Sequence, residues 1–417
     1  MIRIGVLFLV LVARGLCQVD VEVTTNKAAY VVGEPVFVIL NVRNIGSEAV
    51  GYSSCDGHVD LAVESAEKKK QALNLWGCSS GVIGGGSGSC GIDHPPMLAP
   101  NQSTSFQYLL KDYRLPAGNY VLRAKGSAGV RWKYYPNTVP NAPPSPPAQH
   151  KEGDPVPGAN LDISLPIAFA PGTEEGLRLA YAPYVADAEN PGVGTAERRR
   201  AREAIAEMAP EFLEKIIAGF AFGSTPTPDL AVKGLEQIDS AESRADLTSL
   251  YDKSTDLTLR NQIVQALAGI ATPNELKFFA ELLPGRSTPS DDRIRQWAAL
   301  GLGHIGGDVA ARALSGGLAS SSGQVRQAVA TALGNTRSRS AVPLLIRMYG
   351  DNDNTVRNEV CGALSELTHR DWCDGSGTSV TVQQSRWLRW WKLNGPQTAL
   401  YGHDECPKAN TQLPQLH

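Results

Sequence analysis

One serine has the spacing of a hydrolase nucleophile. The pattern Gly-x-Ser-x-Gly occurs at residues 77–81, with Ser79 at its centre. In hydrolases the serine of this pattern occupies a sharp turn between a strand and a helix. Here the pattern lies in a glycine- and serine-rich stretch at 77–91, and neither a helical pattern nor an acidic residue paired with a histidine accompanies it. We therefore interpret Ser79 as a loop residue and expect no catalytic residue here.

A second pattern, Gly-x-Gly-x-x-Gly at residues 301–306, is that of dinucleotide-binding loops. Such a loop must follow a strand and open a helix. Here the glycines end a helical pattern, and Gly301 occupies the position that Ala332 and Ala363 hold in the repeat described below. We expect Gly301 to be a small packing residue and expect no cofactor.

The first 17 residues have the pattern of a secretory signal peptide. Arg3 precedes an apolar run at 4–13, and the small residues Gly15 and Cys17 stand before a possible cleavage point. No later segment approaches the roughly 20 apolar residues that a membrane-spanning helix needs. The chain is therefore expected to be secreted or periplasmic, and a lipid anchor on Cys17 is the alternative interpretation.

Export to an oxidising compartment makes disulfides the first interpretation of the cysteines. Six remain after the predicted cleavage: Cys55, Cys78, Cys90, Cys361, Cys373 and Cys406. Two predicted strands, at 59–66 and 71–76, would form a hairpin that brings Cys55 and Cys78 together.

The other cysteines divide by their places in the helical half. Cys361 falls on a buried helical position and is expected to remain a free thiol, which leaves Cys373 and Cys406 as the second pair. The pairing of Cys90 stays open. A zinc site is the alternative to oxidation, and its ligands would be Cys55, His58, Cys90 and His94.

Length and composition indicate a globular chain of two or three domains. The chain has 417 residues, 42% of them hydrophobic, and a net charge of -3, so it lacks the basic character of a nucleic-acid-binding protein. Before residue 172, short runs rich in Val, Phe, Tyr and Leu alternate with turns, which predicts a β-sandwich. The stretches 77–91 and 136–157 are predicted to be surface loops.

Two stretches of this β-type region resemble bacterial immunoglobulin-like domains. Val-Val-Gly-Glu-Pro-Val at 31–36 resembles the entry to their second strand, and Pro-Ala-Gly-Asn-Tyr at 116–120 resembles a late turn. The resemblance implies an immunoglobulin-like sandwich over residues 18–171. A linker and entry helix are expected at 172–196.

An internal repeat follows, marked by the arginines at 260, 295, 326 and 357. Apolar residues recur three and seven positions after each arginine, and a small residue recurs six positions after it. This spacing predicts one apolar stripe along a helix. A second, shorter helix is predicted after each of the first three, at 275–283, 308–318 and 341–349. Helix pairs at this period predict a stacked α-solenoid.

The stretches VRQAVATALGN at 325–335 and VRNEVCGALSE at 356–366 resemble HEAT repeats of the phycocyanin-lyase type. The resemblance implies an α-α superhelix of the HEAT or armadillo kind over residues 197–371. Deoxyhypusine hydroxylases are HEAT-repeat enzymes that hold iron with His-Glu pairs. This chain contains no His-Glu dipeptide, so the resemblance implies neither that activity nor a metal.

A polar residue precedes each repeat arginine by four positions, where it could cap the helix N-terminus. In the family, the matching acidic residue and arginine tie successive repeats together. We therefore interpret this set as structural, with ligand binding as the alternative. The set comprises Asp256, Arg260, Asp291, Arg295, Arg326, Asp353 and Arg357.

Tryptophans gather in the C-terminal stretch 372–417, which is expected to form a cap and tail. Trp387, Trp390 and Trp391 share one face of a predicted helix. This face could close the end of the solenoid. Alternatively, it could form a contact surface for a sugar or a protein, as could Trp132 in the β-type region.

A repeat array without a catalytic constellation predicts a non-enzymatic, exported binding or scaffold protein that recruits a protein partner. The alternative is an exported hydrolase or carbohydrate-binding accessory protein that acts through the loops of the first domain, with a glycan as its ligand.

Overall fold

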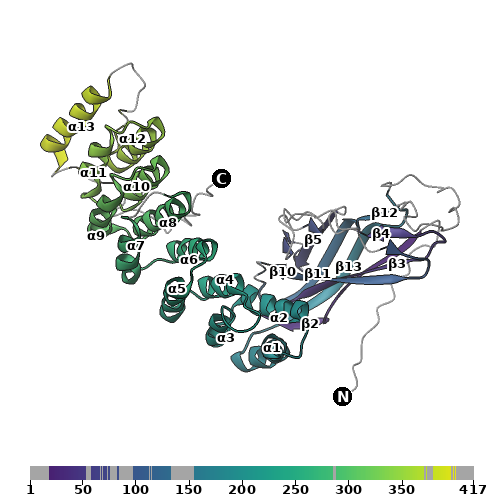
Figure 1. Ribbon diagram of the computed structural model, residues 1–417. Helices are drawn as coiled ribbons and strands as arrows, with labels where there is room; N and C mark the ends of the chain where they lie inside the picture. The colour runs from purple at the N-terminus through teal and green to yellow at the C-terminus, as the bar shows by residue number, and fades with distance from the viewer. Residues whose placement is uncertain are drawn as a thin grey trace, which may run out of the picture. The chain divides into compact units, whose positions relative to one another are not determined.

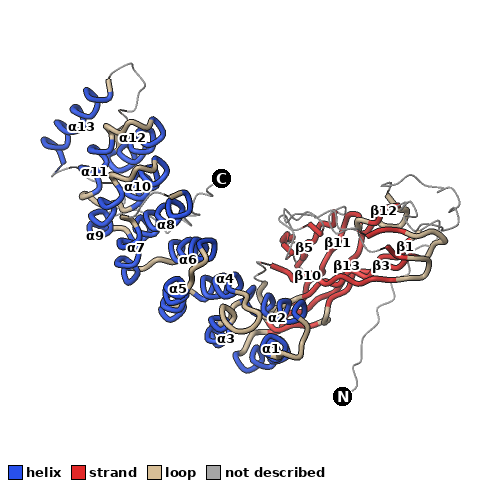
Figure 2. Tube along the Cα trace, viewed as in Figure 1, coloured by secondary structure: helices blue, strands red, loops and turns tan. Residues whose placement is uncertain are grey.

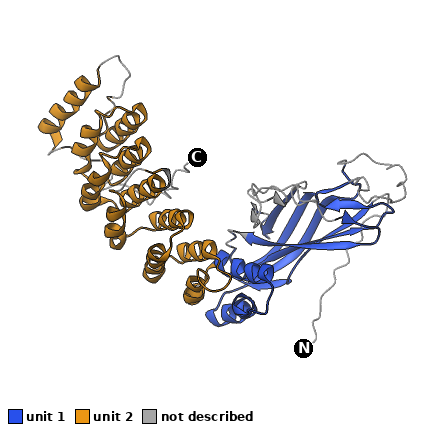
Figure 3. Cartoon of the chain, in the orientation of Figure 1, with its two compact units in different colours: residues 1–208 blue, residues 209–417 orange. Residues whose placement is uncertain are grey.

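The computed structural model describes residues 18–52, 58–65, 67, 69–72, 74–75, 82–83, 97–111, 113, 115–132, 155–284, 288–370, 372, 379–395, 398 and 400. The chain forms two compact units, residues 1–208 and 209–417 (Figure 3). The described strands all belong to the first unit, whereas helices occur in both (Figure 2). A β-rich N-terminal region followed by a helical region is therefore confirmed.

Three sheets build the β-rich region. The first has the order β1 (Val19–Thr25), β3 (Phe37–Asn44), β10 (Ser103–Lys111), β7 (Asn74–Leu75). The second has the order β2 (Ala29–Val31), β13 (Asn160–Ala170), β11 (Gly118–Ser127), β5 (His58–Ser65), β6 (Lys70–Ala72), with β8 (Val82–Ile83) also paired to β5. The third has the order β12 (Val130–Trp132), β4 (Val50–Tyr52), β9 (Met97–Leu98).

The sheets share one hydrophobic core. Alternate residues of β3, among them Val38 and Leu40, are fully buried, and they belong to the same cluster as Leu61 of β5 and Leu122 of β11. This alternation is the signature of strands with one face against a core. The immunoglobulin-like class of the region stays a prediction.

The predicted hairpin at 59–66 and 71–76 is confirmed only in its first half. β5 pairs with β6 through Val63 and Gln71, but Leu75 of β7 pairs with Leu110 in the first sheet. The chain therefore passes from one sheet to the other between β6 and β7. Cys55 and Cys78 lie outside the described residues.

Tyrosines hold the turn between β2 and β3, where the sequence resembles immunoglobulin-like domains. Gly33 has a φ of +93°, a conformation that favours glycine. The Tyr181 hydroxyl donates to the Gly33 carbonyl at 2.8 Å, and the Tyr113 hydroxyl donates to the Glu34 carbonyl. The Glu34 carboxylate is 2% exposed and accepts from the Val31 N–H and from Lys27. These contacts attach the helix of Tyr181 to the strands.

Two helices belong to the β-rich unit, contrary to the expected boundaries. α1 (Glu174–Glu189) and α2 (Thr195–Met208) follow β13, and both lie within residues 1–208. Ala204 of α2 packs on Phe37 of β3 and Leu109 of β10, with Tyr184 of α1 beside them. The sequence analysis places the start of the solenoid at 197, whereas α2 belongs to the same compact unit as the strands.

The second unit consists of helices. The longer ones after residue 209 are α4 (Pro228–Ile238), α5 (Ala241–Lys253), α6 (Leu257–Gly269), α8 (Pro289–Ile305), α10 (Gly323–Asn335), α12 (Asn354–Thr368) and α13 (Val380–Asn394). The shorter ones are α3 (Glu214–Gly219), α7 (Leu276–Leu282), α9 (Gly307–Ala313) and α11 (Ala341–Met348). The four helices that carry the repeat arginines, α6, α8, α10 and α12, pack in sequence against one another (Figure 1).

The predicted apolar stripe is confirmed. The leucines seven positions after each arginine, Leu267, Leu302, Leu333 and Leu364, are all 0% exposed. The predicted packing role of Gly301 is confirmed as well, because a Cβ at this position would lie 2.7–2.9 Å from ring carbons of Phe279. The helices therefore approach closely where the sequence places a small residue.

Candidate functional site

Each repeat arginine donates hydrogen bonds to a backbone carbonyl that precedes its own helix in the chain. Arg260 Nε donates to the Tyr251 carbonyl at 3.3 Å and Arg295 Nε to the Leu283 carbonyl at 2.8 Å. Arg326 donates to the Ser320 carbonyl at 2.7 Å, and Arg357 donates to the Asp351 carbonyl. Each arginine thus satisfies a carbonyl at or after the end of the preceding helix.

These contacts give the repeat arginines a structural role. Arg295 is only 4% exposed, and the Arg260 guanidinium lies 4.5 Å from the centroid of the Tyr251 ring. Arg326 forms a two-point ion pair with Asp351, with N–O distances of 2.6 and 2.9 Å. Burial raises the pKa of Asp351, but hydrogen bonds from Arg326 and the Asp353 N–H outweigh burial and hold that pKa below its ordinary value.

The predicted acidic caps are confirmed at two of three positions. Asp256 accepts from the Thr258 N–H and Asp353 from the Thr355 N–H, both at 2.8 Å. Asp291 does not cap α8, because that helix begins at Pro289 and its N-cap is Thr288. Asp291 donates its own N–H to the Thr288 hydroxyl at 3.2 Å.

Amide side chains line the face of the long helices that lies opposite the buried stripe. Relative to each arginine, they stand two positions before it and one, two, five or nine positions after it. At about 100° per residue, these positions fall within one arc of roughly 100°. We call this surface the amide face; it comprises Asn261, Gln262, Gln265, Gln296, Gln324, Gln327, Asn335 and Asn358, all half-buried or exposed.

Hydrogen bonds along this face connect neighbouring helices. Gln296 of α8 donates to Gln324 of α10 at 3.4 Å, and the Thr331 hydroxyl of α10 donates to Glu359 of α12 at 2.7 Å. Asn261 Oδ1 is buried and accepts no hydrogen bond from the described residues. The face therefore combines ordered polar groups with hydrogen-bonding capacity left over for a bound molecule.

Three tryptophans pack together at the C-terminal end of the described helices. The Trp372 ring lies 4.7 Å from Trp387 and 5.8 Å from Trp390, between centroids. The guanidinium of Arg386 stands 4.3 Å from the Trp372 centroid, and that of Arg370 stands 4.7 Å from the Trp390 centroid. The helix that carries two of these tryptophans, α13, packs against α11, and Gln384 of α13 donates to the Ile346 carbonyl at 2.9 Å, which agrees with the capping interpretation.

The contact-surface interpretation of the tryptophans is wrong for three of the four. Trp387 is 0%, Trp390 9% and Trp132 6% exposed, because each is packed into a hydrophobic core or cluster. Trp391 is half-buried and lies near the Arg339 guanidinium, at 5.9 Å from it.

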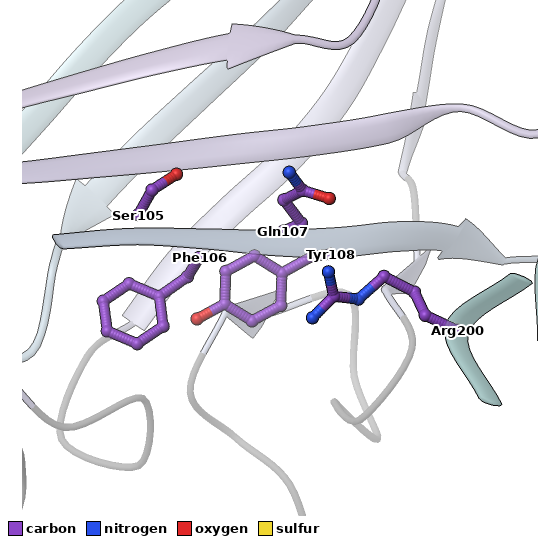
Figure 4. A pocket seen from close by; sticks show the side chains of 5 residues that line it. All are labelled: Ser105, Phe106, Gln107, Tyr108 and Arg200. Carbon is purple, nitrogen blue, oxygen red and sulfur yellow. The ribbon is translucent and has the colours of Figure 1, made fainter. Parts of the chain in front are cut away.

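A hollow of about 320 Å³ lies in the β-rich unit. Its lining comes from one stretch of β10 and from Arg200 of α2 (Figure 4). Phe106 stacks on Tyr52 with a centroid distance of 4.1 Å, and the Tyr108 and Tyr52 hydroxyls lie 3.0 Å apart. No motif pointed to this hollow, because α2 and β10 are distant in sequence.

Several predicted features lie outside the described residues. They are the signal peptide, Ser79, Cys55, Cys78, Cys90, Cys373, Cys406 and His94. Cys361 is described, and the expectation of a free thiol is wrong, because this cysteine is disulfide-bonded. It lies on α12, is 6% exposed, and has its sulfur 3.8 Å from the Tyr349 hydroxyl.

Within the described residues, no group of three or more His, Cys, Asp or Glu side chains could hold a metal.

Stacked helix pairs define the second unit as an α-solenoid, and a family comparison identifies its repeats. Residues 311–374 match the family model of HEAT repeats. No curated protein matches the chain. Within the described residues, no helix is both long and apolar enough to cross a membrane.

Solved structures similar to the chain include three of different kinds. Human deoxyhypusine hydroxylase in complex with glycerol is 17% identical, with 53% of this chain and 92% of that chain covered and a TM-score of 0.22. The ApaA protein from Bordetella pertussis is 14% identical, covering 36% and 89%, with a TM-score of 0.18. Native alpha-2-macroglobulin from Escherichia coli, from domain MG7 to the C-terminus, is 12% identical, covering 90% and 66%, with a TM-score of 0.20.

Proposed function

We propose that the protein is a non-enzymatic, exported binding or scaffold protein whose HEAT-repeat solenoid recruits a protein partner through the amide face. HEAT repeats are typical of protein-interaction modules. The observation that carries the proposal is that amide side chains recur on the same face of α6, α8, α10 and α12.

The chemistry of this face suits a polar protein surface. Each amide side chain can both donate and accept hydrogen bonds, so it can match backbone and side-chain groups alike.

The disulfide at Cys361 supports the exported part of the proposal. Structural disulfides form and persist in secreted and periplasmic proteins and are rare in the cytosol. Cys361 is oxidised and lies at a buried position of its helix. Its oxidation agrees with the secretory signal pattern at residues 1–17.

The test locates the binding surface. A photo-crosslinking amino acid is placed at Gln265 or Asn358 on the amide face, or at Val309 of α9 as a control that is 55% exposed. The same protein should crosslink from both amide-face positions and not from Val309. Binding of that purified partner should then be lost in Asn358→Arg and kept in Val309→Arg. Equal crosslinking from all three positions would refute the assignment.

The alternative function predicts different results from the purified chain. A carbohydrate-binding or hydrolytic protein acting through the first unit would retain immobilised glycans, or turn over ester, peptide or glycoside substrates. We expect neither from the purified chain, and we expect metal analysis to find no stoichiometric ion. A turnover abolished by one substitution would replace the scaffold proposal with an enzymatic one.

A further inference from the structure

The last described helix, α13, has a packed face and an exposed face. Trp387 and Trp390 join the tryptophan cluster, and Gln384 reaches the Ile346 carbonyl of α11, so these residues mark the packed face. In Figure 1, α13 stands at the end of the array, beyond α11 and α12. Most of its exposed residues fall on the opposite side, within an arc of roughly 160° at about 100° per residue. We call this surface the α13 outer face; it comprises Thr381, Val382, Ser385, Arg386, Leu388, Arg389, Lys392 and Leu393, all exposed.

Large aliphatic side chains gather on the α13 outer face. Val382 is 56%, Leu388 51% and Leu393 75% exposed. They are three of the eight exposed large hydrophobic side chains among the described residues, and the other five occur singly on other parts of the chain. The last repeat of a solenoid normally presents a polar outer face to water. The α13 outer face instead has the aliphatic content of a surface that a further helix covers.

The charges of the α13 outer face are all positive. α13 carries Arg386, Arg389 and Lys392 and no acidic residue. Arg386 lies over the Trp372 ring, whereas Arg389 and Lys392 form no ion pair within the described residues. At helical spacing, Arg389 falls near the middle of the outer face, between the aliphatic side chains. A molecule that covers this face must therefore bring negative charge to its centre.

This arrangement favours an acidic protein segment over two other occupants. A second copy of the chain docked through the same face would bring six basic side chains together, and like charges across an interface are costly. A helix that lies on a membrane keeps its basic residues on one face and its aliphatic residues on the other. On α13, by contrast, Arg389 shares its face with Val382 and Leu393, so it would enter the bilayer with them.

We propose that the α13 outer face binds an amphipathic helix of a partner protein, one that carries acidic residues beside its apolar stripe. The stripe covers the three aliphatic side chains, and the acidic residues pair with Arg389 and Lys392. Helices of this kind dock by their apolar face, and charge complementarity selects acidic over basic ones. The α13 outer face is separate from the amide face, so the proposal goes beyond the function proposed above.

The test uses a fluorescein-labelled synthetic helical peptide in which glutamates flank a stripe of leucines, together with its counterpart in which lysine replaces each glutamate. The full chain should bind the glutamate peptide and not the lysine peptide, as measured by fluorescence anisotropy. Leu393→Ala should weaken binding of the glutamate peptide about tenfold, because it removes aliphatic atoms that binding buries. Arg389→Gln should weaken it about threefold to fivefold, the size of an exposed charge pair.

Two matched controls lie on other helices of the same unit. Leu257 of α6 is 45% exposed and Arg293 of α8 is exposed, so Leu257→Ala and Arg293→Gln should leave peptide binding unchanged. Because all four substituted positions are exposed, circular dichroism should show the same fold in each variant. Arg389→Glu combined with Lys392→Glu should reverse the preference and bind the lysine peptide.

Four outcomes would overturn the proposal. The first is failure to bind the glutamate peptide, or binding that Leu393→Ala does not affect. The second is binding that appears only when Asp404→Asn and Glu405→Gln are introduced, which would assign the face to the chain's own C-terminal residues. The third is binding to phosphatidylglycerol vesicles, lost in Leu393→Ala, without binding of the peptide. The fourth is self-association that Leu393→Ala abolishes, which would assign the face to a second copy of this chain.

Discussion

Substituting Gly301 by alanine tests the close approach of helices in the solenoid. In the middle of an exposed helix, Gly→Ala normally stabilises a protein by up to about 1 kcal/mol. At position 301, however, the added Cβ would lie 2.7, 2.8 and 2.9 Å from three ring carbons of Phe279, which is 0% exposed. Overpacking of this kind costs about 1–3 kcal/mol. Because three atoms of a fully buried ring must shift, we expect the upper part of that range and a net loss of about 1–2 kcal/mol.

Gly362 provides a matched control within the same repeat array. It lies in the interior of α12, is exposed, and has no atom within 4 Å of a Cβ built on it. Gly362→Ala should therefore stabilise the helical unit by about 0.5–1 kcal/mol. The two substitutions are chemically identical and should change stability in opposite directions.

Thermal unfolding followed by circular dichroism at 222 nm measures both effects. For a unit of about 200 residues, 1 kcal/mol corresponds to a shift in Tm of about 2–4 °C. Gly301→Ala should lower the Tm of the helical transition by about 2–8 °C, and Gly362→Ala should raise it by about 1–4 °C. The double variant Gly301→Ala with Phe279→Leu should lose less stability than the two single losses combined. Equal stabilisation by both glycine substitutions would refute the packing of α7 against α8.

Three more predictions concern the same unit. Leu333→Ala, at a position that is 0% exposed, should lower the free energy of unfolding by about 2–5 kcal/mol, and an unchanged melting curve would contradict the repeat register. Since the folded-state pKa of Asp351 lies below its unfolded value, its pairing with Arg326 stabilises the fold at neutral pH and is lost as the pH falls below about 4. Arg326→Gln should therefore destabilise the chain at pH 7 and flatten the pH dependence of stability between about pH 5 and 2, as urea titrations at each pH would show. Peptide mapping under non-reducing conditions should recover Cys361 in a cross-linked peptide and identify its partner among the remaining cysteines, including Cys373 and Cys406; recovery of Cys361 as a free thiol would contradict the structure.

The repeat helices were accessible to sequence analysis because their signals are local and recur. Leu333 and its equivalents stand at fixed distances from the repeat arginines, and helical geometry alone brings such positions onto one face. The same register marks Gly301 as a packing residue. The N-cap of α8 was missed, since Thr288 lies three residues before the expected Asp291 and both types are common caps.

The candidate surfaces depended more on tertiary packing. The spacing of Trp387 and Trp390 correctly placed them on one face, but the same spacing fits an exposed platform and a buried cap equally well. Only the packing with Trp372 distinguishes the two.

The sequence by itself determined a β-rich region followed by a repeat array, together with the buried face of each repeat helix. These features follow from periodicities of two and 3.6 residues, which any short window displays. The tertiary structure decided that α2 packs on strands, that Leu75 leaves its expected hairpin for the other sheet, and that Arg200 stands beside Tyr108. Such contacts join residues far apart in the chain, and their positions depend on the packing of whole elements rather than on any local pattern.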